Sequence, residues 1–179
     1  MRRNLFACGG IFFALASTPA FAEGFDGPYV GAQAGIAILH VEGSKLGGPF
    51  EETSETAFAG AVLGYRMPVG ESGVVIGAEG DIGVHVDGGD ARYGVSALAG
   101  VKIGGNSLVY GRVGYGWHDG LPADVGKGLV FGGGFETKLA GNVNARVDYK
   151  YLDLGSTNFP DNTLDYTGHE VTAGIVFGF

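Results

Sequence analysis

Two groups of residues around histidines are the places in this sequence where catalysis would be conceivable. His118 is followed by Asp119, and His85 shares one face of a predicted strand with Asp81, with Ser96 on the next strand. A hydrolytic triad needs a serine hydroxyl within hydrogen-bonding distance of the imidazole. No recognisable nucleophile motif surrounds a serine here, and four histidines spread over 179 residues give such pairs by chance. We interpret these histidines as polar residues at the rim of the fold and expect no catalytic site and no enzyme.

The sequence offers few residues that could support metal or thiol chemistry. The acidic turns at 87–90 and 161–165 supply carboxylate oxygens, but neither turn has the ligand count of a calcium loop. The single cysteine, Cys8, lies in the N-terminal apolar segment. We therefore predict no metal site, no disulfide and no cofactor.

Charged residues within the apolar segments occupy alternate positions. Side chains of a strand alternate between its two faces, so these charges would share one face and leave the other face apolar. All seven basic residues of the segments obey this rule: Arg66, Arg92, Lys102, Arg112, Lys138, Arg146 and Lys150. Acidic residues occur on the same face as the basic ones. We therefore predict an interior network of Arg66, Glu79, Asp81, Arg112, Glu136, Arg146, Asp148, Lys150 and Glu170.

Pairing within this network should follow the order of the strands. Buried charges are tolerated when they are paired. We expect Arg112, Glu136, Arg146 and Asp148 to pair across neighbouring strands, and Lys150 to pair with Glu170.

The elements that must position these residues are eight segments of alternating polarity. Long connections (40–55, 87–91, 119–127 and 152–165) alternate with tight ones (68–73, 104–106 and 140–142). Outer-membrane barrels show this alternation of short turns and longer outside loops. The segments run over 29–39, 56–67, 74–86, 92–103, 108–118, 128–139, 143–151 and 169–179.

The apolar face of these segments suits lipid. Most segments have the 9–12 residues that a tilted strand needs to cross a bilayer, and no outward position of the segments carries a charge. Aromatic residues fall near two rims, as in the belts of membrane barrels. One belt comprises Tyr93, Tyr115, Trp117, Tyr149 and Tyr151, and the other comprises Tyr65, Phe135, Phe177 and Phe179. The pattern predicts an all-β fold, an eight-stranded antiparallel up-and-down transmembrane β-barrel.

The N-terminus has the layout of a secretory signal peptide. Arg2 and Arg3 form a basic start, residues 5–16 form an apolar run, and Ala20-Phe21-Ala22 is a small-x-small cleavage signal. The apolar run is too short to span a bilayer. We predict a cleaved signal peptide at 1–22 and one barrel domain at 23–179. A lipoprotein signal at Cys8 is the less favoured alternative, since Cys8 precedes most of the apolar run.

The whole mature chain resembles the small eight-stranded outer-membrane barrels of Gram-negative bacteria, the opacity-protein and OmpA-type porin-like surface proteins, and four stretches carry the resemblance. They are Gly27-Pro28-Tyr29-Val30-Gly31, residues 77–81, residues 146–155 and residues 169–179. The resemblance implies a place in the outer membrane and insertion by the barrel assembly machinery, which reads a C-terminal strand ending in Phe. The assembly signal would consist of Val171, Ile175, Phe177 and Phe179.

The function expected of such a barrel is structural or surface-interactive. Eight strands leave an interior just wide enough for side chains, so the charge network favours a plug over a pore. Envelope integrity and contact with a host or with lipopolysaccharide are the expected roles. A narrow porin for small solutes is the alternative, and a lipid A-modifying enzyme is less favoured. The predicted outer loops are acidic and the net charge is −8, so the expected partners are lipid bilayer, lipopolysaccharide and a host or surface ligand, with no nucleic acid.

Overall fold

The computed structural model describes residues 25–45, 48–86, 89–119, 126–159 and 162–179. The predicted signal peptide and Cys8 lie outside these residues. The described chain forms eight strands and no helix long and apolar enough to cross a membrane. The strands are β1 (Gly27–Lys45), β2 (Gly48–Pro68), β3 (Val74–His85), β4 (Ala91–Ile103), β5 (Ser107–His118), β6 (Lys127–Ala140), β7 (Val143–Phe159) and β8 (Asn162–Gly178).

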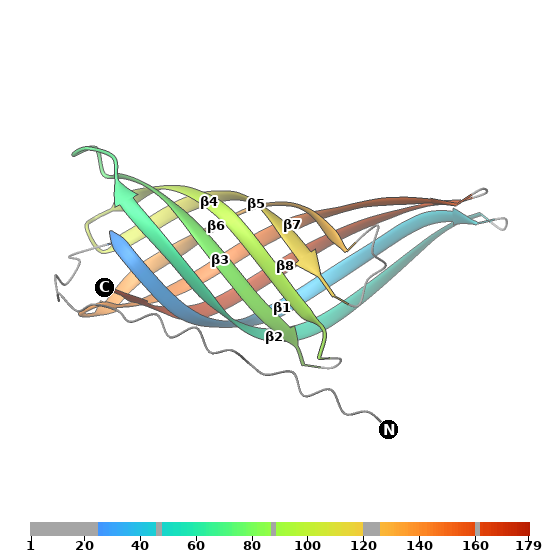
Figure 1. The fold of residues 1–179 in the computed structure, drawn as a ribbon, viewed down its shortest axis with the longest axis horizontal. Helices are drawn as coiled ribbons and strands as arrows, with labels where there is room; N and C mark the ends of the chain where they lie inside the picture. Colours follow the sequence, from blue (N-terminus) through green and yellow to red (C-terminus); the bar gives the residue numbers. More distant parts are fainter. Residues whose placement is uncertain (1–24, 46–47, 87–88, 120–125, 160–161) are drawn as a thin grey trace, which may run out of the picture.

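Each strand pairs antiparallel with its neighbours in sequence, and β8 closes the barrel against β1 (Figure 1). At this seam Val30 lies opposite Phe177 and Gly35 lies opposite Thr172. Closure leaves no unpaired edge along the body of the barrel, which is the requirement for a sheet surrounded by lipid. The predicted eight-stranded antiparallel barrel is confirmed.

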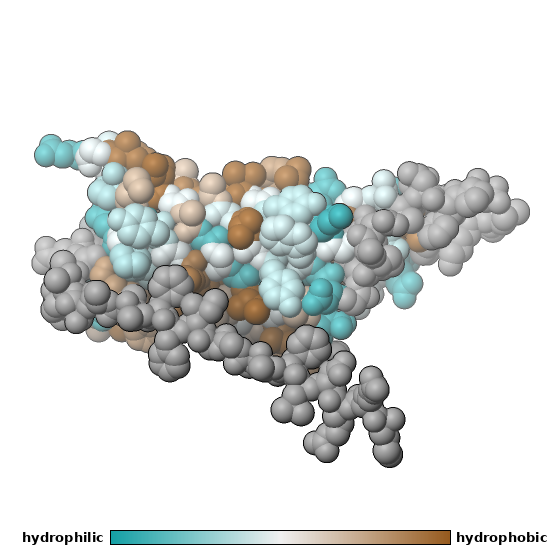
Figure 2. Space-filling view, viewed as in Figure 1, coloured by the Kyte–Doolittle hydropathy of each residue, from teal (hydrophilic) through white to brown (hydrophobic). Residues whose placement is uncertain are grey.

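Burial alternates along the strands as the sequence predicts. In β5, Leu108, Tyr110 and Arg112 are buried, whereas Val109 and Val113, at the alternate positions, are 45% and 49% exposed. Figure 2 shows apolar side chains over the outer face of the barrel. An exposed apolar surface of this extent is typical of a protein whose exterior meets lipid.

The prediction of long loops at 40–55 and 152–165 is wrong, because most of these residues belong to strands. The structure continues β1 to Lys45 and starts β2 at Gly48, and it continues β7 to Phe159 and starts β8 at Asn162. The predicted segments rest on alternating apolar residues, and these stop where the lipid-facing surface stops. Backbone pairing does not need an apolar face, and here it continues through polar residues.

These longer strands form a four-stranded extension, in the order β2–β1–β8–β7, that projects beyond the other strands in Figure 1. Pairing of β2 with β3 begins only at Phe58, and pairing of β6 with β7 reaches only to Asp153. We call this the extension end of the barrel. The opposite end, with the tight connections near Gly70, Gly104 and Gly141, is the turn end.

Buried apolar side chains of the described residues pack inside the barrel in three clusters. At the turn end Phe25, Val75, Leu98 and Leu108 pack with Tyr110. Toward the extension end, Val130, Leu152 and Leu154 form a second cluster. A third cluster, of Tyr29, Val62 and Val176, lies among the polar side chains of the interior, where the Tyr29 hydroxyl bonds to Glu79.

Candidate functional site

The interior of the barrel holds a balanced set of charges. Among the described residues, five cations and five carboxylates form buried ion pairs, and each of their side chains is at most 6% exposed. The balance matters because unpaired charge in a low-dielectric interior is prohibitive. The cations are Arg66, Arg92, Arg112, Arg146 and Lys150, and the carboxylates are Glu79, Asp81, Glu136, Asp148 and Glu170.

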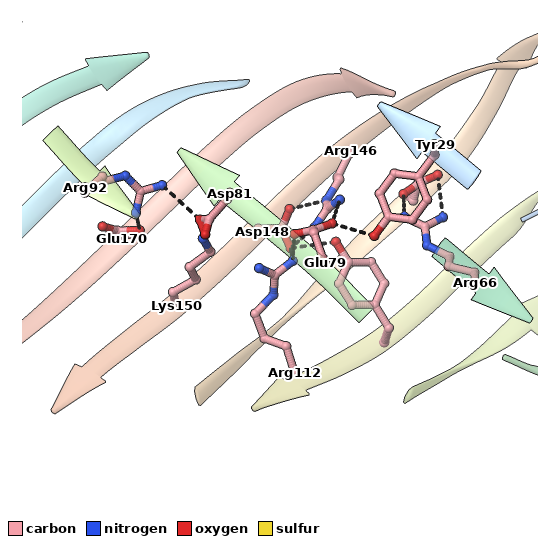
Figure 3. Close-up of polar contacts among 12 residues, drawn as sticks. Tyr29, Arg66, Glu79, Asp81, Arg92, Arg112, Arg146, Asp148, Lys150 and Glu170 are labelled. Atoms are coloured by element: carbon pink, nitrogen blue, oxygen red, sulfur yellow. Dashed lines mark hydrogen bonds and ion pairs between the residues drawn. The ribbon is translucent and has the colours of Figure 1, made fainter. Parts of the chain in front are cut away.

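A central cluster of four charges crosses the lumen between β3, β5 and β7 (Figure 3). Nη2 of Arg112 lies 3.0 Å from Oε1 of Glu79 and 2.9 Å from Oδ1 of Asp148. Arg146 donates from Nη2 to Oε1 of Glu79 at 2.9 Å and pairs through Nε with Asp148. Each arginine therefore holds both carboxylates, and the four side chains join three strands.

Two tyrosines complete the central cluster from β1 and β5. The Tyr29 hydroxyl donates to Oε2 of Glu79 at 2.7 Å, and the Tyr110 hydroxyl donates to Oδ1 of Asp148 at 2.6 Å. Each carboxylate thus accepts hydrogen bonds from both arginines and from one phenol.

Glycines on the inner face make room for these large rings. A Cβ atom on Gly64 would lie 2.3 Å from the Tyr29 ring, and one on Gly134 would lie 2.4 Å from the Tyr110 hydroxyl. Any larger residue at these two positions would displace a tyrosine from its carboxylate. The recurrent glycines inside the strands therefore have a packing role here.

A separate pair lies toward the turn end, between β2 and β6. Arg66 and Glu136 form two parallel hydrogen bonds of 3.0 and 2.7 Å, and their side chains are 3% and 0% exposed. Asn144 donates to Oε1 of Glu136 at 2.8 Å, and the Arg66 guanidinium lies 3.9 Å from the centre of the Tyr29 ring. The pair is thus bidentate and fully enclosed.

A third cluster lies toward the extension end. Arg92 pairs with Glu170 and lies 3.5 Å from Oδ1 of Asp81, which also pairs with Lys150. The Arg92 guanidinium stacks 4.0 Å from the centre of the Phe58 ring. Figure 3 shows this cluster, the central cluster and the Arg66 pair following one another along the barrel.

All nine predicted network residues lie inside, but their pairing differs in part from the expectation. Arg112 and Arg146 pair with Asp148 as expected. The pairing of Lys150 with Glu170 is wrong. These two are direct neighbours in the register, yet Lys150 reaches Asp81 and Glu170 reaches Arg92.

Glu136 likewise pairs across the lumen and not with its neighbour in the register. It lies opposite Arg146 in the register of β6 and β7, but its carboxylate pairs with Arg66 of β2. In a narrow barrel long side chains meet across the lumen as easily as along the sheet. Strand order alone therefore does not predict the partner.

Sequence reasoning left several participants out of the network. Arg92 shares the inner parity of the other basic residues, and that parity is the signal by which it could be included. Four further participants also lie at inner positions, but nothing in a single sequence distinguishes them from ordinary packing residues. They are Phe58, Tyr29, Tyr110 and Asn144.

The two histidine groups do not form a triad. His118 lies 3.6 Å from Oε1 of Glu170, and His85 packs beside Phe58 with 6.1 Å between ring centres. Ser96 lies opposite Glu79 in the register, and no hydrogen bond among the described residues joins it to an imidazole. Within the described part of the chain, no three His, Cys, Asp or Glu residues are arranged to hold a metal ion.

The four residues of the predicted assembly signal lie on the outward face of the last strand and at its end. Val171, Ile175, Phe177 and Phe179 are 37–48% exposed. Predicted belt aromatics such as Tyr93, Trp117 and Tyr149 are exposed to a similar degree. Both sets therefore lie where lipid would contact them.

A closed barrel with an apolar exterior and a paired, charged interior defines an integral membrane β-barrel. Residues 9–179 match the family described as outer membrane protein beta-barrel domain. The chain belongs to this family, and its place is the outer membrane.

Comparison with solved structures finds similar chains at low sequence identity, and the first of them has the same fold. Neisserial surface protein A is 17% identical, with a TM-score of 0.53 over 86% of this chain and 98% of that one. Ail, the attachment invasion locus protein of Yersinia pestis, is 19% identical, with a TM-score of 0.43 over 86% and 100% of the two chains. OprG from Pseudomonas aeruginosa is 13% identical, with a TM-score of 0.46 over 87% and 98%. A comparison with curated protein sequences finds no match.

Proposed function

We propose that this protein is a sealed outer-membrane barrel with a structural or surface-interaction role, and not a channel. The observation that supports this proposal is the central cluster. Arg112 and Arg146 each bind both Glu79 and Asp148 across the lumen, and no side chain of the four is more than 3% exposed. An ion entering this level would have to break several buried ion pairs.

The test is conductance of the pure protein in a planar bilayer. The wild type should show no steady open channel, because the central cluster fills the cross-section. The double variant Arg112→Ala/Arg146→Ala, which removes both cations from that level, should conduct if it still closes. The matched control is Lys127→Ala, an exposed side chain at the start of β6. Steady open channels of the wild type, altered in size by Arg146→Ala, would establish the narrow porin instead.

We infer that the extension end faces outside and makes the surface contacts. Its outward face is acidic: Glu51, Glu42 and Asp165 lie side by side in the register of β2, β1 and β8, and all three are exposed. Three adjacent carboxylates repel anions. Contact with the phosphates of lipopolysaccharide would therefore need bridging divalent cations.

This inference predicts that lipopolysaccharide binding by the purified barrel depends on Mg²⁺ or Ca²⁺. A chelator should reduce binding in a pull-down, and Glu42→Gln/Glu51→Gln should reproduce that loss without chelator. Lipopolysaccharide binding that is indifferent to chelator would contradict the acidic face as the contact.

We also propose that residues 1–22 direct export and that the outward residues of β8 serve in assembly. Phe179 is 48% exposed and its backbone N–H donates to the carbonyl of Pro28, beside the β1–β8 seam. Phe179→Ser should therefore lower the amount of heat-modifiable barrel in outer-membrane fractions more than Glu170→Gln does. Equal and normal insertion of both variants would refute this ranking.

A further inference from the structure

The extension end has two strand edges that no described strand covers. β2 and β7 are its outer strands (Figure 1). Pairing of β2 with β3 begins at Phe58, so residues 51–57 pair with β1 on one side only. Pairing of β6 with β7 likewise reaches only to Asp153. A free edge presents unpaired N–H and C=O groups, and these are a template for an additional strand.

The direction of the free backbone groups of β2 follows from one hydrogen bond. Val86 donates its N–H to the carbonyl of Ala57 at 2.9 Å, so this carbonyl points away from β1. In an antiparallel strand the N–H and C=O of one residue point to the same neighbour, and the direction alternates along the chain. The register of β1 with β2 has no shift, so the backbone groups of Glu51, Thr53 and Glu55 also point away from β1. No backbone of the described residues bonds to them, and they form an open ladder.

The edge of β7, by contrast, is disrupted by its own chain. Its register with β8 shifts between Asp153 and Ser156. Between these two residues Gly155 has a φ of 85°, and its N–H donates to Oδ1 of Asp153 at 3.3 Å. A bulge bends and twists a strand, and it is a common means of blocking an edge. The open ladder is therefore a property of β2 and not of both edges.

The side chains along the open ladder are acidic. Glu51 and Glu55 continue the outward parity and Glu52 the inward parity, and all three are exposed. The sequence of β2 contains no basic residue before Arg66. A second copy of the chain, paired antiparallel about Thr53, would set Glu51 directly against Glu55. Like charges at directly opposite positions are destabilising, so the charge pattern disfavours this self-pairing and favours a basic partner.

We propose that residues 51–57 of β2 bind an extended basic segment of another protein, which adds to the sheet as a strand antiparallel to β2. The added strand continues the line of β3 beyond the point where β3 ends. Its backbone pairs with the open ladder, and its lysines or arginines lie opposite Glu55, Glu52 and Glu51. Directly opposite Cβ atoms are about 4.5–5.5 Å apart, which is within reach of such charge pairs. Backbone pairing supplies the affinity, and the charges select the partner.

This inference names the partner of the extension end, and it rests on the proposed function in which that end faces outside and makes the surface contacts. The bound segment lies beyond the lipid and does not enter the lumen. Its binding therefore requires neither passage through the barrel nor a bridging divalent cation.

The probe is the labelled peptide Thr-Lys-Val-Thr-Lys-Lys-Thr, whose lysines match Glu55, Glu52 and Glu51 in antiparallel order. Binding is measured by fluorescence anisotropy with the barrel in phosphatidylcholine nanodiscs, and empty nanodiscs are subtracted. The first control peptide carries N-methyl groups on the amides that face β2, so it keeps the charge but cannot pair. The second replaces each lysine by glutamate. The basic peptide should bind saturably, the methylated peptide at least tenfold more weakly, and the acidic peptide not at all. Equal binding of the basic and methylated peptides, or no saturable binding, would overturn the proposal.

Variants of the barrel separate the ladder from the charges. Thr53→Pro removes the central N–H, and proline is tolerated on an edge whose N–H faces solvent, so this variant should fold and lose saturable binding. Glu51→Gln/Glu55→Gln keeps the ladder and should weaken binding by about three- to tenfold. Asp165→Asn is the matched control, because Asp165 is an exposed acid of β8, which is not an edge strand. Its affinity should stay close to that of the wild type. Heat-modifiability on a gel verifies closure, and unchanged affinity in a folded Thr53→Pro barrel would refute pairing at this edge.

Amide hydrogen exchange gives an independent signature of strand addition. The amides of Glu51, Thr53 and Glu55 should gain protection when the peptide binds. The amides of Glu52 and Ser54 already face β1, and their exchange should change little. Protection without this alternation would contradict the added strand. A wild-type dimer that Thr53→Pro dissociates would make a second copy the occupant and would also overturn the proposal.

The same peptides distinguish a failure of this inference from a failure of the proposed function. Both ends of the barrel are accessible in a nanodisc, so absence of binding there contradicts only the edge. Intact cells that produce the barrel test its orientation, with cells that produce the Thr53→Pro variant as the background. Binding to nanodiscs but not to intact cells would overturn the outward direction of the extension end, and with it the role in surface contact. Conductance remains the separate test of the sealed lumen.

Discussion

Arg146→Met is expected to destabilise the barrel more than the loss of any other single charge of the interior network. Arg146 is 3% exposed and binds both Glu79 and Asp148. Methionine has a similar length but no charge, so the variant keeps two buried carboxylates with Arg112 as their only cation. Removing one partner from a buried ion pair costs about 3–5 kcal/mol. We expect a loss at the upper end of this range, because two carboxylates lose a partner at once.

The measurement is urea unfolding of the protein refolded into lipid vesicles. Trp117 is the single tryptophan and lies on the exterior, so its fluorescence reports the loss of lipid contact. Lys127→Met is the control, since Lys127 is exposed and has no ion pair among the described residues; its effect should stay within about 0.5 kcal/mol. Arg146→Lys, which keeps the charge but loses the bidentate geometry, should fall between the two. A loss below about 1 kcal/mol for Arg146→Met would show that the central cluster is not tightly coupled.

The register of the barrel follows from the alternation of single residues. A shift of one residue in any strand would move its charges to the lipid and its valines to the lumen. Arg146 and Val147 show this directly: they are adjacent in sequence and are 3% and 52% exposed. A basic residue facing the middle of the bilayer costs roughly 2–4 kcal/mol, so each inner charge also opposes a shift of its strand. This is why the fold, the strand order and the faces could be predicted from one sequence.

The ends of the strands were not predictable in the same way. Outside the lipid the outward face of a strand can be polar, and that of the extension is: His40, Glu42, Thr53 and Thr167 lie at positions that continue the outward parity. The hydrogen bond between His40 and Thr53 joins β1 and β2 there at 3.0 Å. Pairing in this region depends on the neighbouring strand and not on an apolar pattern. A reading based on apolar alternation therefore ends at the membrane boundary and assigns a loop.

The ion-pair partner of each charged side chain inside the lumen could not be predicted from the sequence either. Parity places Asp81, Lys150 and Glu170 inside, but it does not give their height along the tilted barrel or the direction of each side chain. Lys150 pairs with Asp81 of β3 although Glu170 is its nearest neighbour in the register. The side chain of Glu170 is already engaged by Arg92. Partner choice is a property of the closed cylinder, because closure brings β3 and β4 opposite β7 and β8.

The Arg66–Glu136 pair permits a cleaner measurement than the central cluster, because each residue has one charged partner. Arg66→Met should cost about 3–5 kcal/mol, since Glu136 is fully buried and would be left without a cation. Glu136→Leu should cost a similar amount by leaving Arg66 unpaired. Stacking of the Arg66 guanidinium on Tyr29 at 3.9 Å offsets only part of that cost, at about 1–2 kcal/mol.

The double variant Arg66→Met/Glu136→Leu should then be far more stable than the sum of the single variants implies. Its remaining cost comes mainly from Asn144, whose amide loses its acceptor on Glu136, and such a loss is about 1–3 kcal/mol. The same urea titration gives all four corners of the cycle, and we expect a coupling of several kcal/mol between the two sites. Additive losses would mean that water reaches the pair and screens it. A large coupling with a nearly unaffected double variant would mean that the pair adds little net stability. Its contribution would then be to disfavour every closure of the barrel in which Arg66 on β2 and Glu136 on β6 fail to meet.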